Sequence, residues 1–233
     1  MRTLKDKWAL VTGSSRGVGQ QIALGLAGRG CHVIVHGRRV GNTSETLDAL
    51  AGYPVEVRAV GGDLAAPEGV QAVIDAVRAD PGAVDILYNN AAIQNPWKEI
   101  WEITREAWLE TFQINFFAIV QLCNAFAPDM KARGYGRIVN LTSGIRDTPQ
   151  LAPYSVSKAA VDKYTRDLAA ELKGTNVLVN TLDPGWLKTD MGGRQAPGEV
   201  ESVLPGALVP ALLEDNGPSG RFYAAQDYRM LER

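Results

Sequence analysis

The stretch K-W-A-L-V-T-G-S-S-R-G-V-G, residues 7–19, joins a short apolar run to a turn that contains three glycines. The apolar run at residues 8–11 has the length of one buried strand. Apolar side chains then recur at helical spacing in residues 20–27. A strand, a glycine-rich turn and a helix suit an anionic phosphate, because backbone N–H groups point out of a helix N-terminus whose dipole favours negative charge. The glycines taken alone are also compatible with a tight surface turn.

The rest of the chain alternates apolar, β-branched runs with amphipathic stretches. Strands are expected at residues 8–11, 31–36, 55–60, 84–88, 137–141, 177–182 and 221–224, and helices at 18–27, 44–51, 67–79, 105–132 and 153–172. This alternation predicts an α/β fold with a Rossmann-like, doubly wound parallel sheet of about seven strands and helices on both faces. A single domain over residues 1–233 is expected. The Gly/Pro-rich stretch at about 190–210 is predicted to be a flexible substrate loop.

Composition narrows the function classes. The 45% of hydrophobic residues supports a sizeable core, and a net charge of −2 gives no electrostatic reason to expect nucleic acid. Only two cysteines and two histidines are present, which disfavours a disulfide framework, a metal site and a Ser-His-Asp hydrolase. The charged N-terminus and the lack of any membrane-spanning apolar run predict a cytoplasmic protein without membrane contact.

The residues that follow each strand are the candidates for ligand binding, because ligands bind at the carboxyl ends of such sheets. The second strand is followed by H-G-R-R at residues 36–39, with no acidic residue to bind the ribose hydroxyls. Arg38 and Arg39, with Arg16 of the glycine turn, offer planar donors that suit a phosphate. This pattern predicts NADP(H) in preference to NAD(H). The alternative is that Arg38 and Arg39 are solvated charges.

Three other strand ends carry polar or small residues. Asp63 follows the third strand, where it either caps the next helix or accepts a hydrogen bond from an adenine amino group. The small residues N-N-A-A at 89–92 leave room for a flat cofactor, and their amides can tie loops together. The turn D-P-G-W-L-K-T at 183–189 is either a surface turn or brings the Leu187 N–H and the Thr189 hydroxyl to a carboxamide.

The stretch Y-S-V-S-K at residues 154–158 is the most informative for chemistry. Tyr154 and Lys158 project from one helix face, and no other of the seven tyrosines has a lysine four residues later. An ammonium group beside a phenol depresses the pKa of the phenol toward the working pH, which suits a general acid for carbonyl reduction. The alternative is a buried core tyrosine with a hydrogen-bonded hydroxyl.

Two more polar residues are candidates for the same site. Ser143, in N-L-T-S-G, stands at the end of the fifth strand, and its hydroxyl could bind a substrate oxygen. Asn115, in F-Q-I-N-F-F, lies inside an apolar helical stretch, where its amide needs a partner. Asn115 either supports a water chain to Lys158 or satisfies a helix irregularity.

Together these stretches resemble the short-chain dehydrogenase/reductase family in its compact one-domain branch. Residues 12–19 look like its T-G-x-x-x-G-x-G motif, residues 89–92 are similar to its N-N-A-G, and residues 184–189 match its coenzyme motif after the sixth strand. The catalytic tetrad of the family falls on Asn115, Ser143, Tyr154 and Lys158. Order and spacing agree from about residue 7 to residue 191. Ala92 in place of glycine and a segment from Ser143 to Tyr154 that is about two residues short are the departures, and the shorter segment puts the local pocket wall in question.

The resemblance implies an NAD(P)-dependent enzyme that transfers hydride between the nicotinamide and a carbonyl or secondary alcohol. Tyr154 would be the general acid and base, and Ser143 would hold the oxygen. Asn115 would anchor a relay water, and Lys158 would bind the nicotinamide ribose. No metal is expected. The expected coenzyme-binding residues are Gly13, Ser15, Arg16, Gly17, Val18, Gly19, Arg38, Asp63, Leu64, Asn90, Ala91, Tyr154, Lys158, Pro184, Gly185, Leu187 and Thr189.

The substrate is expected to be a small molecule, an apolar or aromatic ketone or aldehyde. The motif P-G-W-L-K-T-D-M-G-G with a short tail looks most like the small carbonyl reductases. The residues expected near the pocket mouth are Gln94, Trp97, Ile145, Gln150, Trp186 and Met191. The alternative for Trp97 and Trp186 is that they pack against each other or a neighbouring loop.

Other functions stay open at this point. One is a non-catalytic NADP(H)-binding sensor, since a fold does not fix a function. Another is a sugar-nucleotide epimerase or dehydratase, although few residues follow Met191 to form a further substrate region. The third is a 3-oxoacyl-type ketoreductase that would recognise its carrier with basic residues such as Arg146 and Arg194. The resemblance also suggests a homodimer or homotetramer through the helices at 105–132 and 153–172.

Overall fold

The computed structural model describes residues 3–230, which contain one seven-stranded sheet in which all strands run parallel. The strands are β1 (Trp8–Val11), β2 (His32–Gly37), β3 (Val57–Gly61), β4 (Ile86–Asn89), β5 (Gly136–Leu141), β6 (Val177–Asp183) and β7 (Phe222–Ala224). Their order is β3-β2-β1-β4-β5-β6-β7. The order reverses between β1 and β4, and in such sheets the crevice at the carboxyl ends of the strands beside this point binds the ligand.

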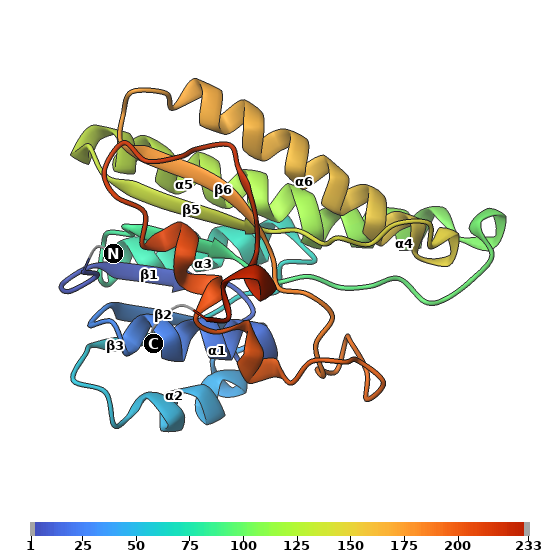
Figure 1. Ribbon diagram of the computed structural model, residues 1–233, viewed down its shortest axis with the longest axis horizontal. Coiled ribbons are helices and arrows are strands. Elements are labelled where there is room, and N and C mark those ends of the chain that lie inside the picture. Colours follow the sequence, from blue (N-terminus) through green and yellow to red (C-terminus); the bar gives the residue numbers. More distant parts are fainter. Residues whose placement is uncertain (1–2, 231–233) are drawn as a thin grey trace.

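Helices cover both faces of the sheet (Figure 1). They are α1 (Gly17–Ala27), α2 (Ser44–Leu50), α3 (Pro67–Ala79), α4 (Arg105–Phe112), α5 (Ala118–Arg133) and α6 (Ala152–Glu171). One buried cluster joins α1 to the sheet, and a second joins α3, α5 and α6 to the other face. The predicted doubly wound fold is therefore confirmed, with strand limits that differ by one or two residues.

The single helix expected at residues 105–132 is wrong in its middle. A π-helical turn at Gln113–Phe117 separates α4 from α5. Such turns contain one more residue than an α-helical turn and are frequent at functional sites. Asn115 lies in this turn, so the polar residue and the irregularity in the helix coincide.

The loop expected at about 190–210 is also wrong in its second half. Val200–Val203 and Gly206–Ala211 form two short 3-10 helices that lie on the same face as α1. Val203, Ala207 and Ala211 are fully buried there. The Gly/Pro content misled the prediction, because the segment is held by burial against α1 and the sheet and not by its own helical propensity.

Within residues 3–230, no helix has the length and apolar character needed to cross a membrane. In the same part of the chain, no group of three or more His, Cys, Asp or Glu side chains could hold a metal ion.

Candidate active site

Thr12 and Asn90 hold the glycine turn against the end of β4. The Thr12 hydroxyl donates to the Tyr88 carbonyl oxygen at 3.3 Å and accepts from the N–H groups of Asn90 and Ala91 at 2.9 and 3.1 Å. The Asn90 amide nitrogen donates to the carbonyl oxygens of Thr12 and Gly13 at 2.8 and 3.2 Å. Asn90 therefore ties the two loops together, as expected of its amide.

His36 also holds the glycine turn in place, a role that the sequence did not reveal. Its Nδ1 accepts the Gly13 N–H at 2.9 Å, and its Nε2 donates to the Gly62 carbonyl oxygen at 3.0 Å. These bonds require a neutral ring, and burial lowers the pKa of His36 in agreement. His36 thus joins the ends of β1, β2 and β3. Its only signal in the sequence was a histidine inside an apolar strand.

The turn between β1 and α1 fits the phosphates of a dinucleotide. The side chain of Arg16, which precedes α1, does not cap the helix, so the first N–H groups of α1 are left for an anion. Gly17 adopts a positive φ of 61°, and a Cβ there would lie 3.5 Å from the Thr189 methyl carbon. The glycine turn and the loop after β6 therefore face each other closely. Ser15 and Val18 belong to the same turn and first helical turn.

Two of the three arginines predicted to bind a phosphate, Arg16 and Arg38, differ in their surroundings. Arg16 forms an ion pair with Asp190 of the loop after β6, with Nε and Oδ2 2.9 Å apart. Both side chains are largely exposed, so the pair contributes little to the free energy of unfolding. Arg16 can therefore leave Asp190 for another anion at little cost. Arg38 is exposed beyond the carboxyl end of β2, and no ion pair joins it to another of residues 3–230. Arg38 is therefore free of the ion pairing that occupies Arg16 in this part of the chain.

Asp63 lies at the end of β3 but does not cap α3 directly. Its Oδ1 accepts the Ala65 N–H at 3.0 Å within a tight turn, and the residue that precedes α3 is Ala66. Asp63 stays exposed, whereas the neighbouring Leu64 is buried among the residues of the α3 face. The prediction that Asp63 caps α3 is therefore wrong. Asp63 still lies at the carboxyl end of β3, the edge of the sheet where a ligand is expected.

Tyr154 and Lys158 lie on the inward face of α6, as the spacing predicted. Both side chains are buried, and the Lys158 Nζ is 5.7 Å from the centre of the Tyr154 ring. The Lys158 Nζ also donates to the Leu141 carbonyl oxygen at 2.8 Å, which anchors it to β5. Ser143, just beyond β5, is near enough to the Tyr154 phenol to lower its pKa by hydrogen bonding. The structure therefore brings together three of the predicted catalytic residues from two elements.

The pKa of Tyr154 differs from the sequence-based expectation. Burial raises the pKa of this phenol, the hydrogen bond from Ser143 lowers it, and the charge of Asp183 raises it again. Burial lowers the pKa of Lys158 to about 8, and Asp162 and Asp183 oppose that shift. Burial outweighs the lowering by Ser143 because a phenolate is costly to form in a buried site, and the depression expected from Lys158 is not among the causes of the shift. Tyr154 therefore keeps its proton at neutral pH.

Asn115 connects α6 to the arm that follows β4, which we define as residues 90–99. Its Oδ1 accepts the Ile93 N–H at 2.9 Å, and its Nδ2 donates to the Ile93 carbonyl oxygen at 2.9 Å and to the Ser157 hydroxyl at 3.1 Å. Ser157 precedes Lys158 on α6. The amide thus has the partners that its burial requires, and it fixes the helix beside Lys158. Asn95, which was not predicted, supports the same arm, because its Oδ1 accepts the Tyr154 N–H at 3.4 Å.

The turn after β6 is sharp, as its proline and glycine predicted. Gly185 has a positive φ of 85°, and the Pro184 carbonyl oxygen accepts the Gln226 side-chain amide at 2.7 Å. Leu187 is buried, and the Thr189 hydroxyl accepts the Gly192 N–H at 3.0 Å. The turn is therefore anchored to the core and is not a plain surface turn.

The expected substrate-binding residues are only partly gathered. Ile145 and Gln94 are half-buried, and the Ile145 N–H donates to the Ser143 hydroxyl at 3.2 Å. Trp97 and Trp186 are 65% and 61% exposed, and Met191 is exposed as well. No ring contact joins Trp97 to Trp186 in residues 3–230. Trp186 instead donates to the Gly192 carbonyl oxygen at 2.8 Å, so it packs on its own loop.

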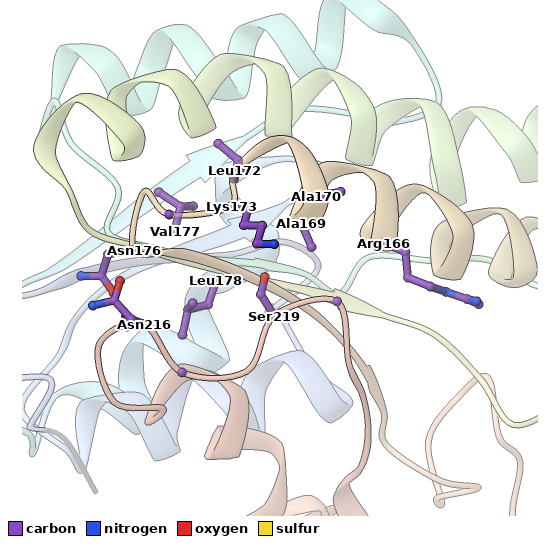
Figure 2. A pocket seen from close by; sticks show the side chains of 13 residues that line it. Arg166, Ala169, Ala170, Leu172, Lys173, Asn176, Val177, Leu178, Asn216 and Ser219 are labelled. Carbon is purple, nitrogen blue, oxygen red and sulfur yellow. Dashed lines mark hydrogen bonds between the residues drawn. The ribbon is translucent and has the colours of Figure 1, made fainter.

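A cavity of about 500 Å³ lies elsewhere, between the end of α6 and the start of β6 (Figure 2). Its lining includes Leu172, Asn176, Leu178 and Ser219. Val177 also lines it and lies six residues before Asp183 on β6, which is about 20 Å along a strand. This cavity therefore lies apart from the group formed by Ser143, Tyr154 and Lys158.

Known proteins are similar to this chain in sequence and in architecture. A sequence model described as short chain dehydrogenase matches residues 7–199. The uncharacterized oxidoreductase YvrD of Bacillus subtilis is 35% identical over 204 residues, which is 84% of this chain and 76% of YvrD. A 3-oxoacyl (acyl-carrier-protein) reductase from Agrobacterium tumefaciens with NADP bound superposes with a TM-score of 0.85 and 29% identity over 95% of this chain and 93% of its own. A blue fluorescent protein from a metagenomic library in complex with NADPH superposes with a TM-score of 0.83 and 27% identity over 96% and 97% of the two chains.

Proposed function

The chain belongs to the short-chain dehydrogenase family and is an oxidoreductase that uses a nicotinamide coenzyme, and from this premise we propose that it is a carbonyl reductase that prefers NADP(H). The observation that carries this proposal is the Tyr154 phenol, which is buried, lies beside Ser143 and is one helical turn from the buried Lys158. A phenol that keeps its proton at neutral pH is suited to protonate a carbonyl oxygen as it gains negative charge.

Each catalytic residue has a separate task in this proposal. Ser143 donates a hydrogen bond to the substrate oxygen and orients it toward Tyr154. Tyr154 gives its proton to that oxygen, and Lys158 stabilises the phenolate that remains. Asn115 lies in the π-helical turn and donates to the Ser157 hydroxyl next to Lys158. In this proposal the turn anchors a relay water that returns a proton to Tyr154. The bound coenzyme supplies the hydride.

The coenzyme residues are proposed on the same basis. The glycine turn and the uncapped start of α1 bind the pyrophosphate, and Arg38 with Arg16 binds the 2′-phosphate. Asp63, Leu64, Asn90 and Ala91 line the adenosine side. Residues 184–189 bind the carboxamide. The NADP in the reductase from Agrobacterium tumefaciens and the NADPH in the metagenomic protein support this choice of coenzyme.

A 3-oxoacyl thioester is the second candidate substrate. The likeness to the 3-oxoacyl (acyl-carrier-protein) reductase favours it. Arg146 and Arg194 are exposed in the two loops that flank the catalytic residues, where they could meet an acidic carrier. The exposed Trp97, Trp186 and Met191 favour instead an apolar or aromatic ketone or aldehyde, which we retain as the first candidate.

Coenzyme oxidation with a panel of carbonyls tests the function. The purified protein is offered NADPH and NADH in parallel, with aromatic and aliphatic ketones, aldehydes, diketones and a 3-oxoacyl thioester. We expect NADPH oxidation with apolar carbonyls and a higher kcat/KM for NADPH than for NADH. Measurable NADPH binding without turnover of any member would contradict a reductase and favour a sensor. Turnover of the thioester alone would favour the second candidate.

Arg38→Ala is expected to raise the Kd for NADPH at least about tenfold and to leave the Kd for NADH nearly unchanged. A charge-assisted hydrogen bond contributes about 1.5–3 kcal/mol, and about 1.4 kcal/mol corresponds to a factor of ten. Titration of protein fluorescence with each coenzyme measures both constants. Lys173→Ala removes the same charge beside the cavity at the other end of β6 and should change neither value. An unchanged ratio of the two constants in Arg38→Ala would show that Arg38 is only a solvated charge.

A further inference from the structure

Asp183, the last residue of β6, connects the two loops that flank the catalytic centre. Its Oδ2 accepts the Gly144 N–H at 3.0 Å, and its Oδ1 accepts the Gly185 N–H at 2.9 Å. Gly144 follows Ser143 in the loop after β5, and Gly185 belongs to the turn that leads to Leu187 and Thr189. One carboxylate therefore fixes the loop of the substrate-binding hydroxyl relative to the coenzyme-binding turn.

The contact between Asp183 and Gly144 leaves no room for a side chain. A Cβ on Gly144 would lie 2.8 Å from the Asp183 Oδ2. Two backbone N–H groups on one carboxylate are charge-assisted hydrogen bonds, which are about twice as strong as neutral ones. An asparagine at position 183 could accept only one of the two, because its NH₂ group would face the other N–H.

The negative charge of Asp183 also acts on Tyr154 and Lys158. This charge raises the pKa of Tyr154 and that of Lys158. Asp162, four residues beyond Lys158 on α6, adds to the effect on Lys158 only. Tyr154 is otherwise faced by the neutral Ser143 hydroxyl from the β5 side. Asp183 is therefore the one carboxylate among residues 3–230 that acts on both groups in these pKa shifts.

We propose that Asp183 is a positioning residue for carbonyl reduction, which fixes the loop of Ser143 against the coenzyme-binding turn through two hydrogen bonds and places a negative charge between these two loops. This inference rests on the proposed function. The two parts have separate physical origins, because the first needs two hydrogen-bond acceptors and the second needs a negative charge. Two substitutions separate them.

Asp183→Asn is expected to lower the kcat for reduction about tenfold and to move the alkaline fall of kcat about half a pH unit lower. Reduction needs the protonated phenol and the charged Lys158, and loss of the carboxylate lowers the pKa of both groups, so the fall begins at a lower pH by about half a unit for one charge. Gly144→Ala keeps the charge but displaces the carboxylate from one N–H group. Gly144→Ala should lower kcat but move the alkaline fall of kcat by less than Asp183→Asn does.

Asp167→Asn is the matched control, because Asp167 pairs with Lys163 on the exposed face of α6. It should change neither the kcat plateau nor the pH profile. Asp183→Asn with an unmoved alkaline fall, or with a wild-type plateau, would overturn the proposal. Thermal unfolding of every variant separates loss of folding from loss of positioning. If Asp183→Asn does not fold, Gly144→Ala with a wild-type kcat would overturn it instead.

A readout without turnover separates this inference from the proposed function. Phenolate absorbance is titrated in the wild type and in Tyr154→Phe, and the difference isolates Tyr154. The same subtraction in the Asp183→Asn background should show a lower pKa for Tyr154. A pKa of Tyr154 that is equal in the two backgrounds would overturn the role of the charge, even if no carbonyl in the panel is reduced. If the pKa of Tyr154 is lower in the Asp183→Asn background but the wild type reduces no carbonyl, the effect of the Asp183 charge on Tyr154 stands. The proposed reductase function is then refuted.

Discussion

Tyr154→Phe is expected to lower the kcat for carbonyl reduction by a factor of about 10² or more while the Kd for NADPH stays within about twofold of the wild type. Proton transfer by a positioned side chain contributes about 10²–10⁴-fold to a rate. The substitution removes the only group that can protonate the substrate oxygen in our proposal, but phenylalanine keeps the buried ring and its packing on α6. Coenzyme oxidation under saturating conditions and a fluorescence titration measure the two constants.

Tyr164→Phe is the matched control for this experiment. Tyr164 lies on the same helix, partly buried, with its ring 6.0 Å from that of Phe116. Removal of its hydroxyl should leave kcat near the wild-type value. A kcat of Tyr154→Phe within about threefold of the wild type would refute the assignment of Tyr154 as the proton donor.

Gly19→Ala is expected to raise the Kd for NADPH at least about tenfold and to lower Tm by several degrees. The added Cβ would lie 2.5 Å from both the Asn90 Nδ2 and the Gly13 carbonyl oxygen, and 2.9 Å from the Ser14 Cα. Two of these neighbours are backbone atoms of the glycine turn that we propose as the pyrophosphate site, so the turn itself must shift. Overpacking costs about 1–3 kcal/mol. An alanine in a helix contributes only about 0.5–1 kcal/mol over glycine, so the clash outweighs the gain.

Gly52→Ala provides the comparison for Gly19→Ala. No atom lies within 4 Å of a Cβ built on Gly52, which is exposed in the turn after α2. We expect its Kd for NADPH and its Tm to match the wild type. Tight NADPH binding by Gly19→Ala would show that the glycine turn is not the pyrophosphate site.

The sequence alone predicted the order of strands and helices, the parallel sheet and the group of Tyr154, Lys158 and Ser143. These features are local or nearly so. A strand or helix shows its buried face through the period of its apolar side chains, and four residues on a helix bring Tyr154 and Lys158 to one face. Residues at the ends of neighbouring parallel strands also share one edge of a sheet, whatever else the chain does.

Only the tertiary structure decided the contacts between residues far apart in the chain. Gly144 binds Asp183 across 39 positions, and Gly13 binds His36 across 23. The π-helical turn at Asn115 and the burial of residues 200–211 against α1 are further cases. In each, the partner decides the conformation, since a buried polar group or a weak helix former is stabilised only by what lies against it. The raised pKa of Tyr154 has the same origin, because burial of the phenol is a property of the folded chain and of no local stretch of sequence.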